Sequence, residues 1–406
     1  MTRRLPLRVS GALVALVTLL SLVACTPDEA TFRGHGYGHG RGMSQWGALG
    51  YAVDHGWSGT QILDHYYRGT TTWEVAPSTQ RVYLMGSDGQ ELVVTQDQGR
   101  LRVDGHGGEV GSVRVLRLSA THYRLYRGAG GCTGPWTFVA DVPADDVEVR
   151  SAVDAGEDPS LMLQRCTTGG TRYYRGSLRL VRGRGSVVTV NQVGTEDMVR
   201  GIVPREVSPS WADAGGGKGL NAVRAQALAA RSYALAGDTR WAPYATTCDS
   251  TYCQAYEGYG FRPTGSGAIQ MNEDRRTDRA VRDTTDQVRV FADGRIAATE
   301  FSSSSGGWTK AGAFPAVVDE GDDIAANPHH DWAVTLTRAQ IETAFDRWAG
   351  RDLGTWNGFD QYVRDGRGDM GGRVVRMTVR FSGGDITVSG DQVRSILGLR
   401  SDWFTA

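Results

Sequence analysis

Between residues 72 and 193, apolar and polar positions alternate in short runs rich in β-branched and aromatic side chains. Runs of this kind, separated by turn residues, are typical of β-strands. Residues 177–182 and 186–190 form a predicted hairpin around Gly183–Gly185. The region carries few side chains suited to catalysis, so we interpret it as a β-rich accessory layer.

On both sides of that region the apolar residues recur at helical spacing. The clearest helix is Leu220–Leu235, an alanine-rich stretch with apolar residues every three or four positions. Shorter helices are predicted at Met43–His55, Ser58–Tyr67, Ala339–Trp348 and Asp391–Leu397. A helical turn or two over Glu196–Ile202 should end ahead of Pro204, because proline cannot donate a helical hydrogen bond. Further strands are predicted at 287–291, 297–301, 374–381 and 385–388.

This order of elements predicts an α+β fold, a mixed helix and sheet body with a β-rich insertion or subdomain. The 406 residues are too many for one ordinary core. We expect residues 31–71 to pack on the C-terminal body, 72–175 to form the β-rich subdomain, and 176–406 to form the main body. The chain is 40% hydrophobic and 22% charged, which is typical of globular proteins. A formal net charge of -1 gives no electrostatic argument for nucleic acid as a partner.

Residues 1–25 have the pattern of a targeting segment. Arg3, Arg4 and Arg8 precede an apolar stretch, Val9–Val23. This stretch is too short, and too often interrupted by Ser, Thr and Gly, for a membrane span. The stretch ends in Leu22-Val23-Ala24-Cys25, which resembles a bacterial lipobox. We predict export, with Cys25 lipidated and two or more acyl chains as the sole membrane anchor. An ordinary signal peptide cleaved nearby is the alternative.

Four cysteines remain after Cys25, an even number in an oxidising compartment. They fall into two local pairs, Cys132 with Cys166 and Cys248 with Cys253, and two disulfides are the economical prediction. A metal site at Cys248 and Cys253 is the alternative. Zinc would need further ligands there, and no histidine lies near that loop in the sequence.

Glu206 is the first candidate for chemistry. It lies in the stretch Gly201–Trp211, where its neighbours include Val203, Pro204 and Val207. Burial among such residues would raise its pKa, so that the carboxyl group keeps a proton at neutral pH and donates it to a leaving oxygen. A solvated surface glutamate is the alternative, and it describes most glutamates.

Two other stretches attract attention. Phe301–Thr309 contains four serines and two glycines, which could present hydroxyl and N–H groups to a sugar or form a flexible loop. A serine nucleophile lacks support, since the chain has no Gly-x-Ser-x-Gly elbow there. Gly34–Gly42 could bind metal through His35 and His39, although a tight packing turn is the simpler interpretation.

Residues 195–256 resemble the stage II sporulation protein D family (the SpoIID/LytB-type domain). The matching segments, in chain order, are Glu196–Glu206, Trp211, Ala222–Leu235, Asp249–Tyr256, 302–307, His330–Trp332 and Val388–Ser401. Two further motifs, Gly38–Ala48 and Tyr66–Thr70, follow the Val388–Ser401 element in the family but come first here. We therefore hypothesise a circular permutation in which residues 31–70 pack beside the segment ending at Ala406.

The resemblance implies a lytic transglycosylase that acts on peptidoglycan glycan strands already stripped of stem peptides. Glu206 corresponds to the family's essential acid, and no cofactor is required. A hydrolase would need a second carboxylate, for which Asp249 is the candidate. The resemblance implies sugar contacts from Arg231, Gln254, Tyr256, Ser303, Ser304, His39 and Gln45. Some family members carry a metal in the loop corresponding to Cys248–Cys253.

Two rival functions stay open at this point. One is a non-catalytic peptidoglycan-binding module that enhances a cell-wall amidase, and the other is a metal-dependent wall hydrolase that uses the histidines. Sporulation and general wall remodelling are equally compatible with the sequence.

Overall fold

The computed structural model describes residues 27–237 and 239–406. The predicted signal peptide and the lipidation of Cys25 therefore lie outside the described residues. In the part of the chain that is described, no helix is long and apolar enough to cross a membrane. The chain combines helices with several sheets, which confirms the predicted α+β class.

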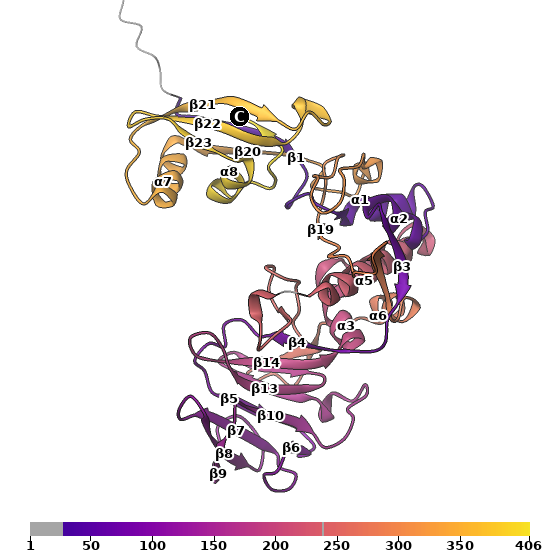
Figure 1. Cartoon of the computed structure of the whole chain (residues 1–406), viewed down its shortest axis with the longest axis vertical. Coiled ribbons are helices and arrows are strands. Elements are labelled where there is room, and N and C mark those ends of the chain that lie inside the picture. The colour runs from indigo at the N-terminus through magenta and orange to yellow at the C-terminus, as the bar shows by residue number, and fades with distance from the viewer. Residues whose placement is uncertain (1–26, 238) are drawn as a thin grey trace, which may run out of the picture.

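Two sheets build the lower body in Figure 1. The first has the strand order β15-β4-β14-β13-β10-β6 and the second the order β17-β16-β12-β11-β5-β7-β8-β9. Their bounds are β4 (Thr79–Tyr83), β5 (Leu92–Thr95), β6 (Leu101–Val103), β7 (Ser112–Arg117), β8 (His122–Gly128), β9 (Thr137–Pro143), β10 (Asp146–Ser151), β11 (Leu163–Thr167), β12 (Gly170–Tyr174), β13 (Ser177–Arg182), β14 (Val187–Gly194), β15 (Thr247–Cys248), β16 (Gly260–Pro263) and β17 (Gln270–Met271).

Apolar residues of both sheets meet in one core, in which Val82 and Leu178 of the first sheet join Val115 and Leu125 of the second. The predicted hairpin is present as β13 and β14. Both sheets use strands from either side of residue 175, so no sheet boundary falls there. The Cys132–Cys166 disulfide lies in this body, as predicted.

The middle of the molecule is built around helix α5 (Leu220–Ala236). Its small residues allow close packing against the surrounding helices. These are α1 (Gln45–Val53), α2 (Gly59–Tyr66), α3 (Thr195–Glu206) and α6 (Arg275–Asp283), beside the two-stranded sheet of β3 (Thr70–Glu74) and β18 (Gln287–Phe291). We call this part the helical centre.

Helix α3 differs from its prediction, because it continues through Pro204 and ends at Glu206. Val199 and Val203 of α3 are fully buried against α5 residues such as Val223 and Ala227. Tertiary packing of this kind supplies most helical stability and here outweighs the lost proline hydrogen bond. The continuation matters for function, since it places Glu206 on the last turn of a buried helix.

Residues 29–35 and the last residues of the chain lie side by side in the upper body of Figure 1, which we call the C-terminal body. It contains a sheet of order β20-β1-β24, a sheet of order β21-β22-β23, and two helices. Their bounds are β1 (Glu29–His35), β20 (Asp331–Thr337), α7 (Arg338–Ala349), β21 (Trp356–Arg364), β22 (Val374–Phe381), β23 (Ile386–Val388), α8 (Gly390–Leu397) and β24 (Phe404–Thr405). Strand β1 pairs antiparallel with β24 through Arg33↔Thr405 and Gly34↔Phe404. Residues 33 and 34 therefore pack beside the last strand, while the circular permutation itself stays a hypothesis.

The predicted strand at 297–301 is largely missing. Only β19 (Phe301–Ser302) is present, paired in parallel with β2 (Met43–Ser44). This short pairing joins the residues that follow the Gly/His-rich segment to the start of the serine-rich loop.

Candidate functional site

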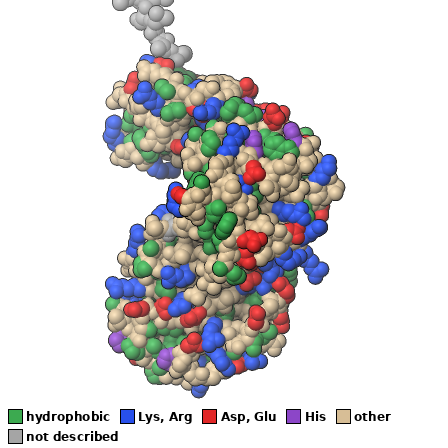
Figure 2. Space-filling view, turned by 45° about the vertical axis from the view of Figure 1, so that its right-hand side comes forward, with side chains coloured by type: hydrophobic (Ala, Val, Ile, Leu, Met, Phe, Trp, Pro, Cys, Tyr) green, Lys and Arg blue, Asp and Glu red, His purple; other side chains and the backbone are tan. Residues whose placement is uncertain are grey.

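A cleft of about 870 Å³ opens where the C-terminal body meets the helical centre. Figure 2 shows the surface hollowed between the upper body and the rest of the molecule. The cleft is lined by Tyr37, Gly38, His39, Arg41, Gln45, Glu206, Tyr233, Arg240, Thr251, Tyr252, Cys253, Gln254, Glu300, Phe301, Ser302, Ser303 and Arg394. Five of the predicted site residues are among them, namely Glu206, Gln45, His39, Gln254 and Ser303.

Glu206 lies on the cleft wall with its carboxyl group partly covered by protein. Its Oε1 accepts a hydrogen bond from the backbone N–H of Ala255 at 2.7 Å, and the side chain of Gln45 donates another. Burial raises the pKa of Glu206 above its ordinary value of 4.5, and these two hydrogen bonds oppose that rise only in part. The group is therefore suited to hold a proton and to release it when a neighbouring oxygen becomes basic.

The position of Gln45 is fixed by hydrogen bonds at the start of helix α1. It is the first residue of α1, whose N-cap Ser44 accepts from the N–H of Gly47 at 3.1 Å. The Nε2 of Gln45 also donates to Oε1 of Gln226 at 3.4 Å, which fixes the orientation of the amide. With its amide so held, Gln45 presents N–H groups to Glu206 and stabilises its ionised form.

The facing wall comes from the Gly/His-rich segment. The pKa of His39 is lowered to about 4 by burial and by the nearby Arg41, so its imidazole is neutral at neutral pH. Its Nδ1 accepts the N–H of Arg41 at 3.0 Å, which leaves the proton on Nε2. The guanidinium of Arg41 holds Glu300 through Nε and Nη2, at 3.0 and 2.8 Å from Oε1. This wall therefore offers one neutral donor and one closed ion pair.

The glycines of this segment serve close packing. A Cβ on Gly42 would lie 1.9 Å from the carbonyl oxygen of Glu300, and one on Gly36 would lie 2.8 Å from that of Ser304. Both glycines have positive φ, which other residues adopt only with strain. The packing turn is thus the better interpretation of the glycine run.

Two aromatic side chains on the cleft are exposed to an unusual degree. Tyr252 is 70% exposed and Tyr37 is 45% exposed. Tyr37 is held edge-on against the ring of His329, with centroids 4.8 Å apart. Exposed tyrosines on the cleft that Glu206 also lines offer flat apolar faces with a polar tip, the kind of surface on which a sugar ring can rest.

The serine-rich loop is not a flexible linker. Buried Asp322 accepts hydrogen bonds from Ser304 Oγ at 2.8 Å and from the N–H of Ser305 at 2.9 Å. Ser305 Oγ donates to the buried Asp319 at 2.6 Å. These contacts hold Ser302 and Ser303 on the cleft.

Three comparisons bear on the family. A family model described as SpoIID, Stage II sporulation protein, matches residues 183–291. The chain carries a SpoIID domain. An uncharacterized protein of Brachyspira hyodysenteriae is 32% identical over 146 residues, covering 35% of this chain and 34% of that protein. The Amidase enhancer of Bacillus subtilis is 28% identical over 151 residues, covering 36% of this chain and 18% of that protein. The matched region is thus about a third of one relative and less than a fifth of the other, and no solved structure matches the chain.

The SpoIID domain supplies only part of the cleft. Glu206, Tyr252 and Gln254 lie within residues 183–291, whereas the facing wall comes from His39, Arg41 and the other residues outside it. The site therefore depends on the packing of residues 37–45, 300–303 and Arg394 against the domain.

Three predicted sugar contacts do not reach the cleft. Arg231 is fully buried and ion-paired with Glu196, with Nη2 2.6 Å from Oε2. Tyr256 is buried with its hydroxyl group donating to Asn191 at 2.6 Å, and its ring packs where only a glycine fits, at Gly201. The buried hydroxyl group of Ser304 donates a hydrogen bond to Asp322. The prediction of sugar contacts from these three residues was wrong, because their polar groups are already bonded to other residues inside the fold.

Asp249, the candidate second carboxylate, also lies away from the cleft lining. Burial raises its pKa to about 6, and its Oδ1 accepts the N–H of Met85 at 2.8 Å. Its role in the SpoIID domain is to anchor the loop that follows β15 to the sheet edge.

The Cys248–Cys253 disulfide is present, which confirms the second predicted pair. Sulfurs joined in a disulfide offer no thiolate to a metal. Across residues 27–237 and 239–406, no group of three or more His, Cys, Asp or Glu side chains is placed to hold a metal ion.

Sequence reasoning missed Glu300 and the exposed tyrosines. Glu300 directly precedes the serine-rich stretch, so a closer look at that motif's border was the available signal. Nothing in the sequence distinguished Tyr37 or Tyr252 from the other tyrosines, because exposure depends on the completed fold.

Proposed function

We propose that this chain is a lytic transglycosylase that cleaves the glycan strands of peptidoglycan outside the cytoplasm, with Glu206 as its acid/base group. The observation that carries the proposal is the raised pKa of a partly buried Glu206 on the wall of a large cleft. The SpoIID domain and the similarity to a protein named Amidase enhancer support a role at the cell wall.

The chemistry needs one carboxyl group in two protonation states. Protonated Glu206 donates to the glycosidic oxygen between N-acetylmuramic acid and N-acetylglucosamine as that bond breaks. The resulting carboxylate then takes the proton of the C6 hydroxyl group, whose oxygen closes onto C1 and forms the 1,6-anhydro sugar. The N–H of Ala255 and the amide of Gln45 stabilise the carboxylate between the two steps.

A hydrolytic mechanism would need a second free carboxylate beside the scissile bond. Two carboxyl groups of the described chain line the cleft, Glu206 and Glu300. Glu300 is engaged by Arg41 through a two-point ion pair. This engagement favours the one-carboxylate mechanism.

Product analysis tests the proposal directly. Glycan strands freed of stem peptides are digested with the purified chain, and the ends are examined by mass spectrometry. We expect 1,6-anhydromuramic acid ends without uptake of water. Reducing ends that incorporate ¹⁸O from labelled water would show hydrolysis and contradict the proposal.

The Glu300→Gln variant separates the two mechanisms further. We expect it to keep the anhydro product and to lose no more than about tenfold in rate, the effect of disturbing one surface ion pair on the cleft wall. A loss as deep as that of a Glu206 variant, measured in the same assay, would instead assign Glu300 a direct role in bond cleavage.

Tyr252 is expected to support a sugar ring. Replacement by alanine should raise KM about tenfold, equal to about 1.4 kcal/mol of binding, with a smaller change in kcat. Tyr252→Phe keeps the flat face and should stay near the wild-type KM. Phe138→Ala removes another exposed ring, on β9 away from the cleft, and serves as the matched control.

A second function is favoured by one observation, the relative named Amidase enhancer. In that role the chain would bind glycan and stimulate a cell-wall amidase without cutting. Stimulation of an added amidase that survives in the Glu206→Gln variant would support this second role.

The placement outside the cytoplasm, with Cys25 as a lipid attachment site, belongs to the same proposal. Mass spectrometry of the mature N-terminus tests it, because an acylated Cys25 at position one distinguishes a lipoprotein from a secreted chain.

A further inference from the structure

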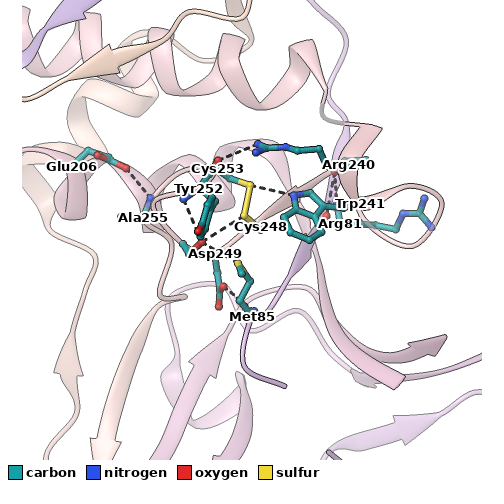
Figure 3. The surroundings of a disulfide bond; sticks show 12 residues. Arg81, Met85, Glu206, Arg240, Trp241, Cys248, Asp249, Tyr252, Cys253 and Ala255 are labelled. Carbon is teal, nitrogen blue, oxygen red and sulfur yellow. Dashed lines mark hydrogen bonds between the residues drawn. A yellow bond between two sulfur atoms is a disulfide. The ribbon is translucent and has the colours of Figure 1, made fainter. Parts of the chain in front are cut away.

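A short segment of the SpoIID domain, Cys248–Ala255, connects a disulfide to the carboxyl group of Glu206 (Figure 3). At its first end, Cys248 pairs with Tyr83 in the sheet and is almost completely buried. The next N–H, of Asp249, donates to the carbonyl oxygen of Tyr83 at 3.1 Å. This end of the segment is therefore part of the rigid sheet.

The disulfide returns the chain to that rigid end. Cys253 lies on the cleft wall and is bonded to Cys248, and the indole N–H of Trp241 donates to its sulfur at 3.3 Å. The N–H of Cys253 also donates to the carbonyl oxygen of Ser250 at 2.8 Å. The four residues between the cysteines thus form a closed loop that carries Tyr252 into the cleft.

Beyond the disulfide, two residues bring the chain to Glu206. Gln254 Nε2 donates to the carbonyl oxygen of Ala230 on α5 at 3.1 Å, and the N–H of Ala255 donates to Glu206 Oε1 at 2.7 Å. The distance along the chain from the bonded sulfur to this N–H is only two residues. A shift of Cys253 is therefore transmitted to the hydrogen bond on the carboxyl group.

We propose that the Cys248–Cys253 disulfide is a positioning element for the acid/base group. It keeps the N–H of Ala255 hydrogen-bonded to Glu206, and it keeps Tyr252 on the cleft wall where the glycan strand is proposed to bind. The inference rests on the proposed function for its kinetic consequence, but its structural part is independent of any activity. Without the bond, hydrogen bonds to Tyr83 and Met85 still hold Asp249 and one to Ala230 still holds Gln254, but the loop between them loses its covalent closure at Cys253. Segments held by hydrogen bonds alone open at lower free-energy cost.

The second disulfide supplies a matched control. Cys132–Cys166 joins the loop before β9 to β11 in the lower body, and neither of its cysteines lines the cleft. Removing either bond deletes one covalent link from the same fold. Only the removal of Cys248–Cys253 is expected to disturb Glu206.

The test compares Cys248→Ser/Cys253→Ser with Cys132→Ser/Cys166→Ser. In the folded protein, the backbone amide of Ala255 should exchange with deuterium at least about tenfold faster in the first variant and at an unchanged rate in the second. Cleavage at neutral pH should fall about 10- to 100-fold in the first variant, the range expected for small misplacement of a catalytic group. Its pH profile should also change, because burial and the Ala255 hydrogen bond, which act on the pKa of Glu206 in opposite directions, are both altered when the segment loosens.

Chemical reduction of the folded protein tests the same point if the Cys248→Ser/Cys253→Ser variant does not fold. The Cys132→Ser/Cys166→Ser protein is treated with dithiothreitol, which transfers two electrons and two protons, becomes a cyclic disulfide and leaves two thiols at 248 and 253. Faster Ala255 exchange after reduction supports the proposal. Unchanged exchange, with the pH profile also unchanged, overturns it even when the protein cleaves glycan. A protein that cleaves nothing but shows the exchange difference would overturn the proposed function alone.

Discussion

Replacing Glu206 by glutamine is expected to lower the rate of glycan cleavage about 10²- to 10⁴-fold, the usual contribution of a general acid or base. The amide has nearly the same shape, and its oxygen can still accept the N–H of Ala255. It cannot donate a proton to the glycosidic oxygen or take one from the C6 hydroxyl group. Release of anhydro products from peptide-free glycan, followed by mass spectrometry, measures the loss.

The variant should fail in chemistry and not in folding. Burial raises the pKa of Glu206 in the folded chain above 4.5, so the group stabilises the fold below its unfolded pKa and loses that contribution as pH rises through its folded pKa. At neutral pH the neutral glutamine avoids that penalty. We therefore expect Glu206→Gln to unfold at the same temperature as the wild type or higher.

Glu257→Gln is the matched control for this prediction. Glu257 is a partly exposed glutamate of the same domain, 3.0 Å from Arg205 and absent from the cleft lining. Its replacement makes the same chemical change and should leave cleavage within about twofold of the wild type. Equal losses in the two variants would remove Glu206 from the mechanism.

The pH dependence follows from the same group. Because the first step needs protonated Glu206, the rate should fall as pH rises through its raised pKa. His39 is neutral across that range, since its pKa is lowered to about 4, and it adds no second transition near neutral pH. A rate that increases steadily as pH rises above the ordinary carboxyl pKa of 4.5 contradicts the assignment.

The sequence predicted the site less well where a side chain is bonded to other residues inside the fold and so does not face the cleft. Glu206, Gln45 and Ser303, which the sequence motifs singled out, line the cleft, while their catalytic and sugar-binding roles stay predictions. Arg231 and Tyr256 belong to equally specific motifs, but the fold uses them for a buried ion pair and a core contact. A motif identifies a required side chain without telling whether the requirement is catalytic or structural.

The elements were predicted where local pattern decides them and missed where packing does. The α5 helix and the β13–β14 hairpin follow directly from spacing and turn residues. The end of α3 does not, since burial of Val203 carries the helix past Pro204. Likewise the partner strands of the two lower sheets could not be assigned, because pairing across a hundred residues leaves no local trace.

Replacing Asp322 by alanine should cause a large loss of stability. Its carboxylate, almost completely buried, accepts from the hydroxyl groups of Ser44 at 2.6 Å and Ser304 at 2.8 Å, and from His330 Nδ1 at 3.0 Å. Removing it leaves these donors and a charged imidazole without their acceptor. Breaking a buried ion pair in this way costs about 3–5 kcal/mol. Chemical denaturation followed by tryptophan fluorescence measures the loss.

The same cluster explains the last two of the four serines, Ser304 and Ser305, and it predicts a pH window for stability. Burial alone would raise the pKa of Asp322, but hydrogen bonds from His330, from the hydroxyl groups of Ser44 and Ser304 and from the N–H of Ser305 lower it below 3.8. Its contribution to stability is therefore present above that value and is lost as pH falls through the folded pKa. Asp322 in turn raises the pKa of His330 above 6.5, so the charged pair is complete below 6.5 and is lost as pH rises through the folded value. The stability difference between wild type and Asp322→Asn should therefore be larger at about pH 5.5 than at about pH 8.5. Asp323→Asn changes the neighbouring, exposed carboxylate, 3.8 Å from the other nitrogen of His330, and should cost less than about 1 kcal/mol at either pH. If Asp322→Asn and Asp323→Asn are equally stable, the serine-rich loop is held by contacts other than those of Asp322. The position of Ser303 on the cleft then depends on a different contact.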